Sequence, residues 1–437
     1  MRLPGRGCGE GTGTVDSTQH HQRHRRTVWR KRRRVAQNGP LRIAATATGR
    51  PRPGNSGYRP SFLTIMTKDE LIAWANDPRR QDTLPFGLYE PLEQKAIVGA
   101  ALVVRGALYF KGGYTKPVRA ALVDCYNRYM AAIDEFAKVF AKAAEQPVPK
   151  ASPMRWFYEE GQKPVEFAKA RGFPAVADTL PSTQVLVATT TSADHKLAAG
   201  FFEFSAFCIP DWQAELGDRG LDAMVFSVPR RFLEMCPGTF EKLFAEFAAA
   251  VPTIWGHAGI GVNLPPLDPE ANEASENFWS RLYGPGIDVG DPMRTSIRDL
   301  VDKIKTVDWL TALGGDLVRH IGGADALMLP PDWFRKTPLD RGGMLIQAGV
   351  APTAGVPIGK GIPPAPPAAY VLLNHALRSI VADKSGILQR GTVNSTAPLL
   401  NTTVACEAWL QRFNVPDDEL NGYWVELHKT QKLSPSS

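Results

Sequence analysis

Apolar residues recur at three- and four-residue steps in four segments, which is the spacing of one face of an α-helix. The longest segment follows Pro117 and predicts an amphipathic helix that ends near Ala144. Its apolar positions are Val118, Leu122, Tyr126, Tyr129, Met130, Ile133, Phe136 and Phe140. Further helices are predicted at residues 240–247, 306–323 and 368–381, and Pro229 stands where the first turn of another helix tolerates proline. In residues 306–323 the shared face holds Val307, Leu310, Leu313, Leu317 and Ile321.

Other segments have the two-residue period or the unbroken apolar character of β-strands. Residues 96–110 are small, β-branched and apolar, which predicts a strand buried on both faces. Alternation predicts strands at residues 200–208, where Glu203 and Ser205 oppose the apolar positions, and at residues 253–262, where Trp255 and His257 share one face. Residues 184–190, 221–227 and 344–350 complete the set of predicted strands.

This mixture of elements predicts an α+β protein, with mixed or antiparallel sheets packed against long helices. The order strand–strand–helix occurs twice, which suggests two related subdomains, although no letter-by-letter repeat is visible. One folded region is expected from residue 66 to residue 437, with residues 66–250 and 251–437 as its two halves.

The first 65 residues differ from the rest, because they contain no apolar run long enough to form a core. We interpret them as a disordered Arg-rich segment that need not belong to the native protein. The alternatives are a phosphate-binding tail, a nuclear address or a transit peptide, suggested by "WRKRRRV" at residues 29–35. Thr67 and Glu70 form a predicted capping box directly after Met66, so structure is expected to begin where a start codon could lie.

Charge divides the chain at the same place. Residues 1–65 hold 14 of the 51 Lys and Arg residues but only two of the 44 acidic residues, which leaves 37 basic and 42 acidic residues in the rest. The folded region therefore carries about five net negative charges. This balance argues against a nucleic-acid-binding surface there and favours a basic partner.

No segment has the features of export or membrane insertion. The best candidate for a signal sequence, "LRIAATA", is interrupted by Arg42, and the longest later apolar stretch is shorter than the roughly 20 residues that a membrane helix requires. Five cysteines are widely spaced without a C-x-x-C pair and are interpreted as reduced, mostly buried thiols. We therefore expect a cytoplasmic protein that does not interact with membranes.

The search for catalytic chemistry is mostly negative. No G-x-S-x-G, H-E-x-x-H, Walker or dinucleotide-binding motif follows a predicted strand, and no histidine has a second ligand at metal-binding spacing. His257 is the best catalytic candidate, and the pair Glu159 and Glu160 could act as acid and base or hold a divalent ion. A structural histidine and a solvated strand end are the preferred interpretations. We therefore predict no catalytic residues, metal, cofactor or small-molecule substrate.

Three later segments resemble a known family. "TVDWLTALGGDLVRHIGG" at residues 306–323, "RGGMLIQAGVAPTAG" at 341–355 and "PPAAYVLLNHALRSI" at 366–380 resemble, in this order and spacing, the TsiV-like family of type VI secretion immunity proteins. The resemblance extends back to the strand near Ile97. One departure is Val356, where the family tends to have an acidic residue after the A-P-x-x-G turn.

The resemblance implies a protein that captures a toxin injected by bacteria into rivals, and members are associated with nucleases of the VRR-Nuc type. An acidic inhibitor could occupy the basic surface that a nuclease presents to phosphate. Two alternatives stay open: an α+β enzyme of unknown reaction that uses His257 or Glu159, and a nucleic-acid-binding protein that uses the basic tail.

Acidic residues interleaved with aromatics mark two candidate partner-binding stretches. An ordinary solvated loop is the alternative for each. The first is "DWQAELGDRGLD", with Asp211, Trp212, Glu215, Asp218 and Asp222. The second lies in residues 264–294, a Pro-, Gly- and acid-rich stretch predicted to run along the surface around a short helix; its candidates are Asp268, Glu270, Glu273, Glu276 and Trp279.

Overall fold

The computed structural model describes residues 68–77, 80–86, 97–144, 156–159, 172–193, 195, 197–217, 220–267, 269–390 and 400–433. These residues belong to one compact unit, Ser61–Ser437. The predictions for residues 1–65, Asp218, Asp268 and Glu160 lie outside the described residues.

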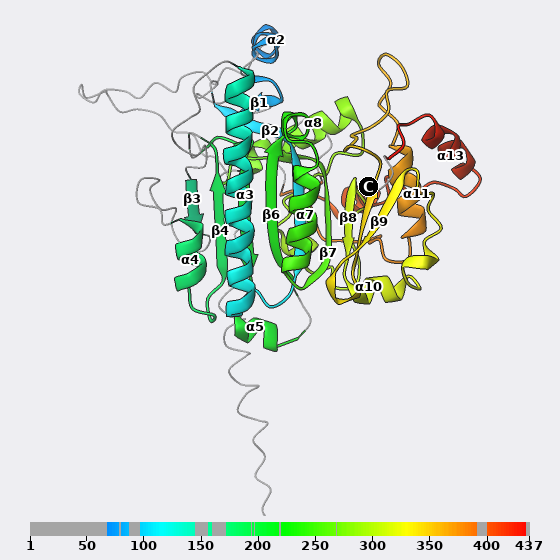
Figure 1. The fold of residues 1–437 in the computed structure, drawn as a ribbon. Helices are drawn as coiled ribbons and strands as arrows, with labels where there is room; N and C mark the ends of the chain where they lie inside the picture. Colours follow the sequence, from blue (N-terminus) through cyan, green and yellow to red (C-terminus); the bar gives the residue numbers. More distant parts are fainter. Residues whose placement is uncertain are drawn as a thin grey trace, which may run out of the picture. The chain divides into compact units, whose positions relative to one another are not determined.

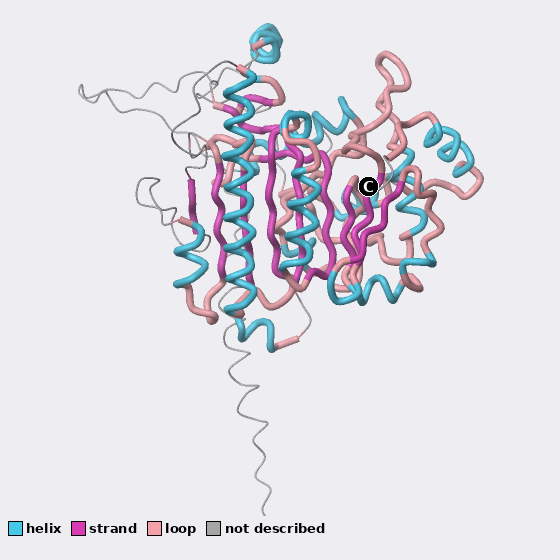
Figure 2. Tube along the Cα trace, viewed as in Figure 1, coloured by secondary structure: helices cyan, strands magenta, loops and turns pink. Residues whose placement is uncertain are grey.

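One antiparallel sheet organises this unit (Figure 2). Its strands follow the order β3-β4-β5-β6-β2-β7-β8-β10-β9, and the short β1 pairs with β2. Their bounds are β1 Thr83–Pro85, β2 Val98–Phe110, β3 Trp156–Glu159, β4 Leu186–Thr191, β5 Glu203–Cys208, β6 Asp222–Pro229, β7 Thr253–Asn263, β8 Leu310–Leu313, β9 Phe334–Pro338 and β10 Met344–Ala348. The predicted α+β class with antiparallel strands is therefore confirmed. The sheet continues across residue 250, because β2 pairs with both β6 and β7.

The helices α3 (Lys116–Ala143) and α7 (Thr239–Ala250) cover one face of the sheet (Figure 1). The apolar stripe predicted for the long helix is its buried face, including Leu122, Tyr129 and Ile133. Phe226 of β6 packs between the helices and contacts Phe240 and Phe247 of α7. Close packing here requires Gly106 of β2, since a Cβ at that position would lie 2.9 Å from the Phe226 ring. We call this side the helix-covered face.

The remaining helices are mostly short, and one of them, α4, packs against α3 on the helix-covered face. They are α2 Lys68–Asn76, α4 Phe173–Thr179, α5 Asp211–Glu215, α6 Arg231–Met235, α8 Glu273–Tyr283, α9 Thr295–Arg298, α10 Gly315–His320, α11 Ala368–Ala376, α12 Thr403–Leu410 and α13 Leu420–His428. None of the described helices is long and apolar enough to cross a membrane. The four described cysteines, Cys125, Cys208, Cys236 and Cys406, are free and buried, as predicted.

The prediction of one helix at residues 306–323 is wrong. Residues 310–313 form β8, which pairs with β7 and β10, and the helix α10 begins only at Gly315. Gly314 has an extended backbone (φ −71°, ψ 162°) and separates the two elements. The leucines repeat at helical spacing by coincidence, because Leu310 and Leu313 are buried in the sheet and Leu317 is buried in the helix that follows.

Three smaller differences concern the start of α6, the end of α11 and the edge strand β9. Pro229 ends β6 and does not begin a helix, since α6 starts at Arg231. The last predicted helix stops at Ala376. Strand β9 was not predicted because "FRKTP" is mostly charged and exposed, as suits a strand at the edge of the sheet.

Candidate partner-binding surface

The second face of the sheet is polar at its centre, and we call it the polar face. Arg105 of β2 lies opposite Ser227 of β6, which lies opposite Glu203 of β5. On the other side of β2, the face continues with Gly259 and His257 of β7. Because strand residues alternate between faces, these positions all point away from α3 and α7. The alternation predicted for β5 and β7 is therefore confirmed.

The segment between α8 and β8, which contains Asp288, Pro292 and Leu300, covers this face, and we call it the covering loop. Asp288 joins three basic side chains beneath it. One carboxylate oxygen, Oδ1, accepts from Lys305 Nζ at 2.6 Å. The other, Oδ2, lies 2.8 Å from Arg105 Nη2 and 3.2 Å from His257 Nε2. All four side chains are at least 94% buried. We call these four residues the Asp288 cluster.

Burial and ion pairing oppose each other in this cluster. Burial alone would raise the pKa of Asp288, but Lys305, His257 and Arg105 hold it well below its usual range. Burial lowers the pKa of Lys305 and of His257 despite the nearby carboxylate. His257 thus faces the Asp288 carboxylate in a buried environment that disfavours protonation of its ring. Its Nδ1 has no hydrogen-bond partner among the described residues.

Aromatic side chains attach the covering loop to the same face. Tyr109 and Trp255 stack with ring centroids 3.9 Å apart. The Tyr109 hydroxyl donates to the carbonyl of Pro292 at 3.0 Å, and Trp255 Nε1 donates to the carbonyl of Leu300 at 2.8 Å. The loop is thus fixed to the sheet by both ion pairs and buried hydrogen bonds.

The structure corrects the second predicted partner-binding stretch. Glu273, Glu276 and Trp279 lie on α8 and are 4%, 1% and 3% exposed, so the expectation of a surface position is wrong for them. Both glutamates occupy the first turn of α8, where the helix dipole favours negative charge. Glu276 accepts from the Gly290 amide at 3.0 Å and from Gln389, while Glu273 accepts from the Arg390 amide. Among the described acidic candidates of this stretch, Glu270 is the most exposed, and it pairs with Arg390.

The first predicted stretch lies at the surface over part of its length. Trp212 of α5 is 53% exposed, and Leu216 after the helix is 80% exposed. Asp211 accepts from Ser182 Oγ at 2.7 Å, and Trp212 Nε1 donates to the carbonyl of Thr183, so this surface has a defined conformation. Glu215 is exposed on the same helix.

Asp222, from the same stretch, is fully buried, so the expectation that it lies at the surface is wrong. Its carboxylate accepts from the amides of Gly113 at 2.6 Å and Ile209 at 2.8 Å. Burial raises its pKa to about 6. Asp222 therefore connects the ends of β2, β5 and β6 and offers nothing to a partner.

A cavity of about 370 Å³ opens on the polar face, beside the part of the sheet that the Asp288 cluster occupies. Its floor is formed by β4, β5 and β6 through Thr189, Glu203, Ser205 and Val225. Its walls come from residues 262–267 and 269–270, Glu276 of α8, residues 290–293, Arg105 and Arg390. A volume of this size is within the roughly 300–1,000 Å³ typical of binding pockets.

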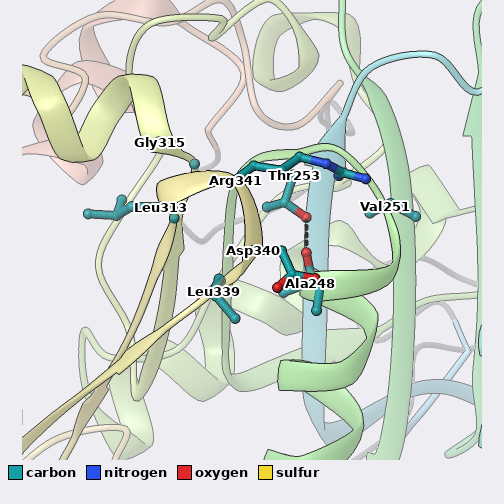
Figure 3. Close-up of a pocket in the computed structure, with 11 residues that line it drawn as sticks. Ala248, Val251, Thr253, Leu313, Gly315, Leu339, Asp340 and Arg341 are labelled. Atoms are coloured by element: carbon teal, nitrogen blue, oxygen red, sulfur yellow. Dashed lines mark hydrogen bonds between the residues drawn. The ribbon is translucent and has the colours of Figure 1, made fainter.

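A second pocket, of about 20 Å³, lies where the end of α7 meets β8 and the turn between β9 and β10 (Figure 3). Thr253 Oγ1 bonds the carbonyl of Ala248 at 2.8 Å beside it. The space suits about one water molecule. Among the described residues, no group of three or more His, Cys, Asp or Glu side chains is placed to hold a metal ion.

Sequence reasoning missed the residues that shape the polar face. Asp288 stands between the fully buried Ile287 and Val289, and this apolar flanking was its available signal. Arg105 is a lone charge inside the apolar strand β2, which indicates a buried partner. The side chains of the pair Glu159 and Glu160 are outside the described part of the chain.

Comparison with known proteins gives the molecule its context. No curated protein matches the chain. A solved structure entitled "Pseudomonas aeruginosa T6SS protein PA0821" is similar to it, with 28% sequence identity and a TM-score of 0.69, covering 84% of this chain and 97% of that one. The family model TsiV, described as type VI immunity for VRR-NUC, matches residues 121–413, which include strands β3 to β10 but not β1 and β2. This chain therefore belongs to the TsiV family of type VI immunity proteins.

Proposed function

We propose that this protein binds a cognate antibacterial effector, a nuclease, and neutralises it by covering its active or DNA-binding surface. The observation that carries the proposal is the family match over residues 121–413, because the family is described by immunity to VRR-NUC. The protein acts as a stoichiometric inhibitor and not as a catalyst. It works in the cytoplasm, where a nuclease would reach the producer's DNA.

Charge supports this assignment. Beyond residue 65 the chain has 42 acidic and 37 basic residues, whereas a nuclease must present Lys or Arg side chains to phosphate. Opposite net charges accelerate encounter between the partners and favour the correct relative orientation. The inhibitor would thereby compete directly with DNA for the same basic surface.

The exposed surface around α5 is the first proposed contact. Trp212 and Leu216 expose apolar area beside Asp211 and Glu215, which combines an aromatic anchor with negative charge. Buried aromatic anchors supply much of the energy of protein interfaces, and acidic neighbours supply complementarity to a basic enzyme. This surface is better suited to a partner than α8, whose acidic residues already have partners inside the protein.

Co-expression with the protein encoded by the adjacent gene tests the function. We expect rescue of growth, co-purification of the two proteins and loss of nuclease activity in the purified complex. Replacing Trp212 by Ala should weaken binding by about 2 kcal/mol, or roughly 30-fold. Val404→Ala is the matched control, since Val404 is 76% exposed on α12. Absence of any complex with the wild-type chain would refute the proposed function.

A further inference from the structure

The cavity on the polar face has an unbalanced set of charges. Four acidic residues line it, Glu203, Glu270, Glu276 and Asp291, against the two basic residues Arg105 and Arg390. Arg105 is paired with Asp288 behind the cavity wall, and Arg390 is paired with Glu270 at the rim. Each arginine therefore already has a carboxylate as its ion-pair partner.

The carboxylates differ in how well they are satisfied. Glu276 accepts from the Gly290 amide and from Gln389. Glu203 accepts a hydrogen bond from the neutral Ser205 hydroxyl at 3.1 Å, and Asp291 accepts from the Met293 amide at 2.8 Å. No described basic side chain forms an ion pair with Glu203 or Asp291. A partly enclosed carboxylate without a counter-ion favours the arrival of a cation.

Arg105 adds an incompletely satisfied side chain to the cavity wall. Its side chain is 6% exposed and lines the cavity, and its Nε has no hydrogen-bond partner within the described structure. A buried donor without an acceptor costs about 1–3 kcal/mol. A basic side chain of an incoming polypeptide would supply the counter-ion that Glu203 and Asp291 lack.

We propose that this cavity receives a Lys or Arg side chain from a loop of the effector, with Glu203 and Asp291 as its counter-ions. The inference rests on the proposed function and names the contact through which it would act. The captured side chain would be one that the nuclease otherwise presents to a DNA phosphate. Neutralisation and occlusion would then be the same event.

The titration of the site gives the proposal a specific signature. Burial raises the pKa of Glu203 to about 7, opposed by its bond to Ser205 and by Arg105, while Asp291 raises it further. Burial likewise raises the pKa of Glu276 to about 7, opposed mainly by Arg105 and Gln389. A bound cation requires the ionised carboxylate, so affinity should increase roughly tenfold from pH 6 to pH 8 through Glu203 alone.

The test measures the affinity of the full chain for the purified protein encoded by the adjacent gene, at pH 6 and pH 8. Glu203→Gln keeps the shape of the side chain and should weaken binding at least tenfold at pH 8, and it should remove most of the pH dependence. Asp291→Lys, at the exposed rim, should weaken binding at both pH values. If Glu203→Gln does not fold, this second variant decides whether the cavity binds a basic side chain. Glu135→Gln on α3, on the helix-covered side and with a side chain 63% exposed, is the control and should bind like wild type.

The outcomes separate the two proposals. Weaker binding by Glu203→Gln and Asp291→Lys, with an unchanged Glu135→Gln control, supports capture of a basic side chain. Wild-type affinity in both cavity variants would overturn this inference while leaving the immunity function intact. Failure of the wild-type chain itself to bind would instead overturn the proposed function on which the inference rests.

Discussion

The two faces of the sheet are built from the same strands but are stabilised in opposite ways. The helix-covered face buries aromatic and aliphatic side chains such as Phe226 beneath α3 and α7, whose own buried residues include Leu122 and Phe240. The polar face buries Arg105, His257, Asp288 and Lys305 and then opens into a cavity lined by carboxylates. Apolar burial contributes favourably to folding, whereas buried charges often cost more in desolvation than their pairing returns.

This difference indicates where stability and function are located. A protein that needed only a stable sheet could cover both faces with apolar residues, because replacing buried ion pairs by hydrophobic residues is often neutral or stabilising. We infer that the charged centre of the polar face positions the covering loop and the cavity wall, while the helix-covered face supplies most of the folding energy. Substitutions on each face should therefore fail in different ways.

The largest effect is expected from Asp288→Ala. The change removes the common partner of Lys305 and Arg105 and leaves two buried cations uncompensated, which should lower the free energy of unfolding by about 5 kcal/mol. Chemical denaturation followed by tryptophan fluorescence measures this loss. The control is Glu270→Ala, which breaks the exposed pair with Arg390 and should cost less than about 1 kcal/mol. Equal effects of the two changes would contradict the role given to the Asp288 cluster.

Phe226→Ala tests the helix-covered face and should cost about 4 kcal/mol, because it leaves a cavity under α7 as well as losing apolar burial. The loss should be nearly independent of pH, since no charge is involved. The same denaturation experiment at pH 5 and pH 8 checks this expectation. Val404→Ala removes an exposed side chain and should change stability by no more than about 0.5 kcal/mol. A pH-dependent loss in Phe226→Ala would show that the two faces are not energetically separate.

The helix-covered face could be predicted well from sequence, because its packing depends on periodicity. The stripe that includes Leu122 and Ile133 defined α3, and the unbroken apolar run before it defined β2. The same reasoning failed at residues 306–323, where leucines of a strand and of a helix happen to continue one 3.6-residue pattern. Pairing of β8 with β7 and β10 determines its structure, and those partners are distant in the sequence.

The polar face was largely out of reach of sequence patterns. Charged residues are normally solvated, so Glu273 and Glu276 were expected at the surface, and no buried position was predicted for Asp288. Their burial depends on partners from other elements, such as Gln389 for Glu276 and Lys305 for Asp288. The local signs were the single charge of Arg105 inside an apolar strand and the apolar neighbours of Asp288. Family membership, by contrast, was evident from the sequence, because three segments occur in the order and spacing of the family although no single motif is specific.

The smallest expected effect on stability has the opposite sign and comes from Glu203→Gln. Burial raises the folded-state pKa of Glu203 to about 7, above its ordinary value of 4.5. Between these values the unfolded chain loses the proton while the folded chain keeps it, so the wild type loses stability as pH rises through this range and carries the full cost above pH 7. Glutamine has no such cost. Because Glu203 is partly exposed to the cavity, we expect the variant to be more stable by about 2 kcal/mol at pH 8 and nearly equal to wild type at pH 4.5.

Denaturation curves at both pH values measure this difference in stability. The raised pKa values of Glu276 and Asp308 also make stability depend on pH, but they are present in both proteins and cancel in the comparison. Val404→Ala, which changes no ionisable group, should show no such difference between the two pH values. A Glu203→Gln variant that is less stable than wild type at pH 8 would contradict the conclusion that the buried, ionised carboxylate of Glu203 destabilises the fold. A variant that is more stable and yet binds the effector more weakly would show that Glu203 is retained for its partner and not for the fold, since purely structural residues lose both properties together.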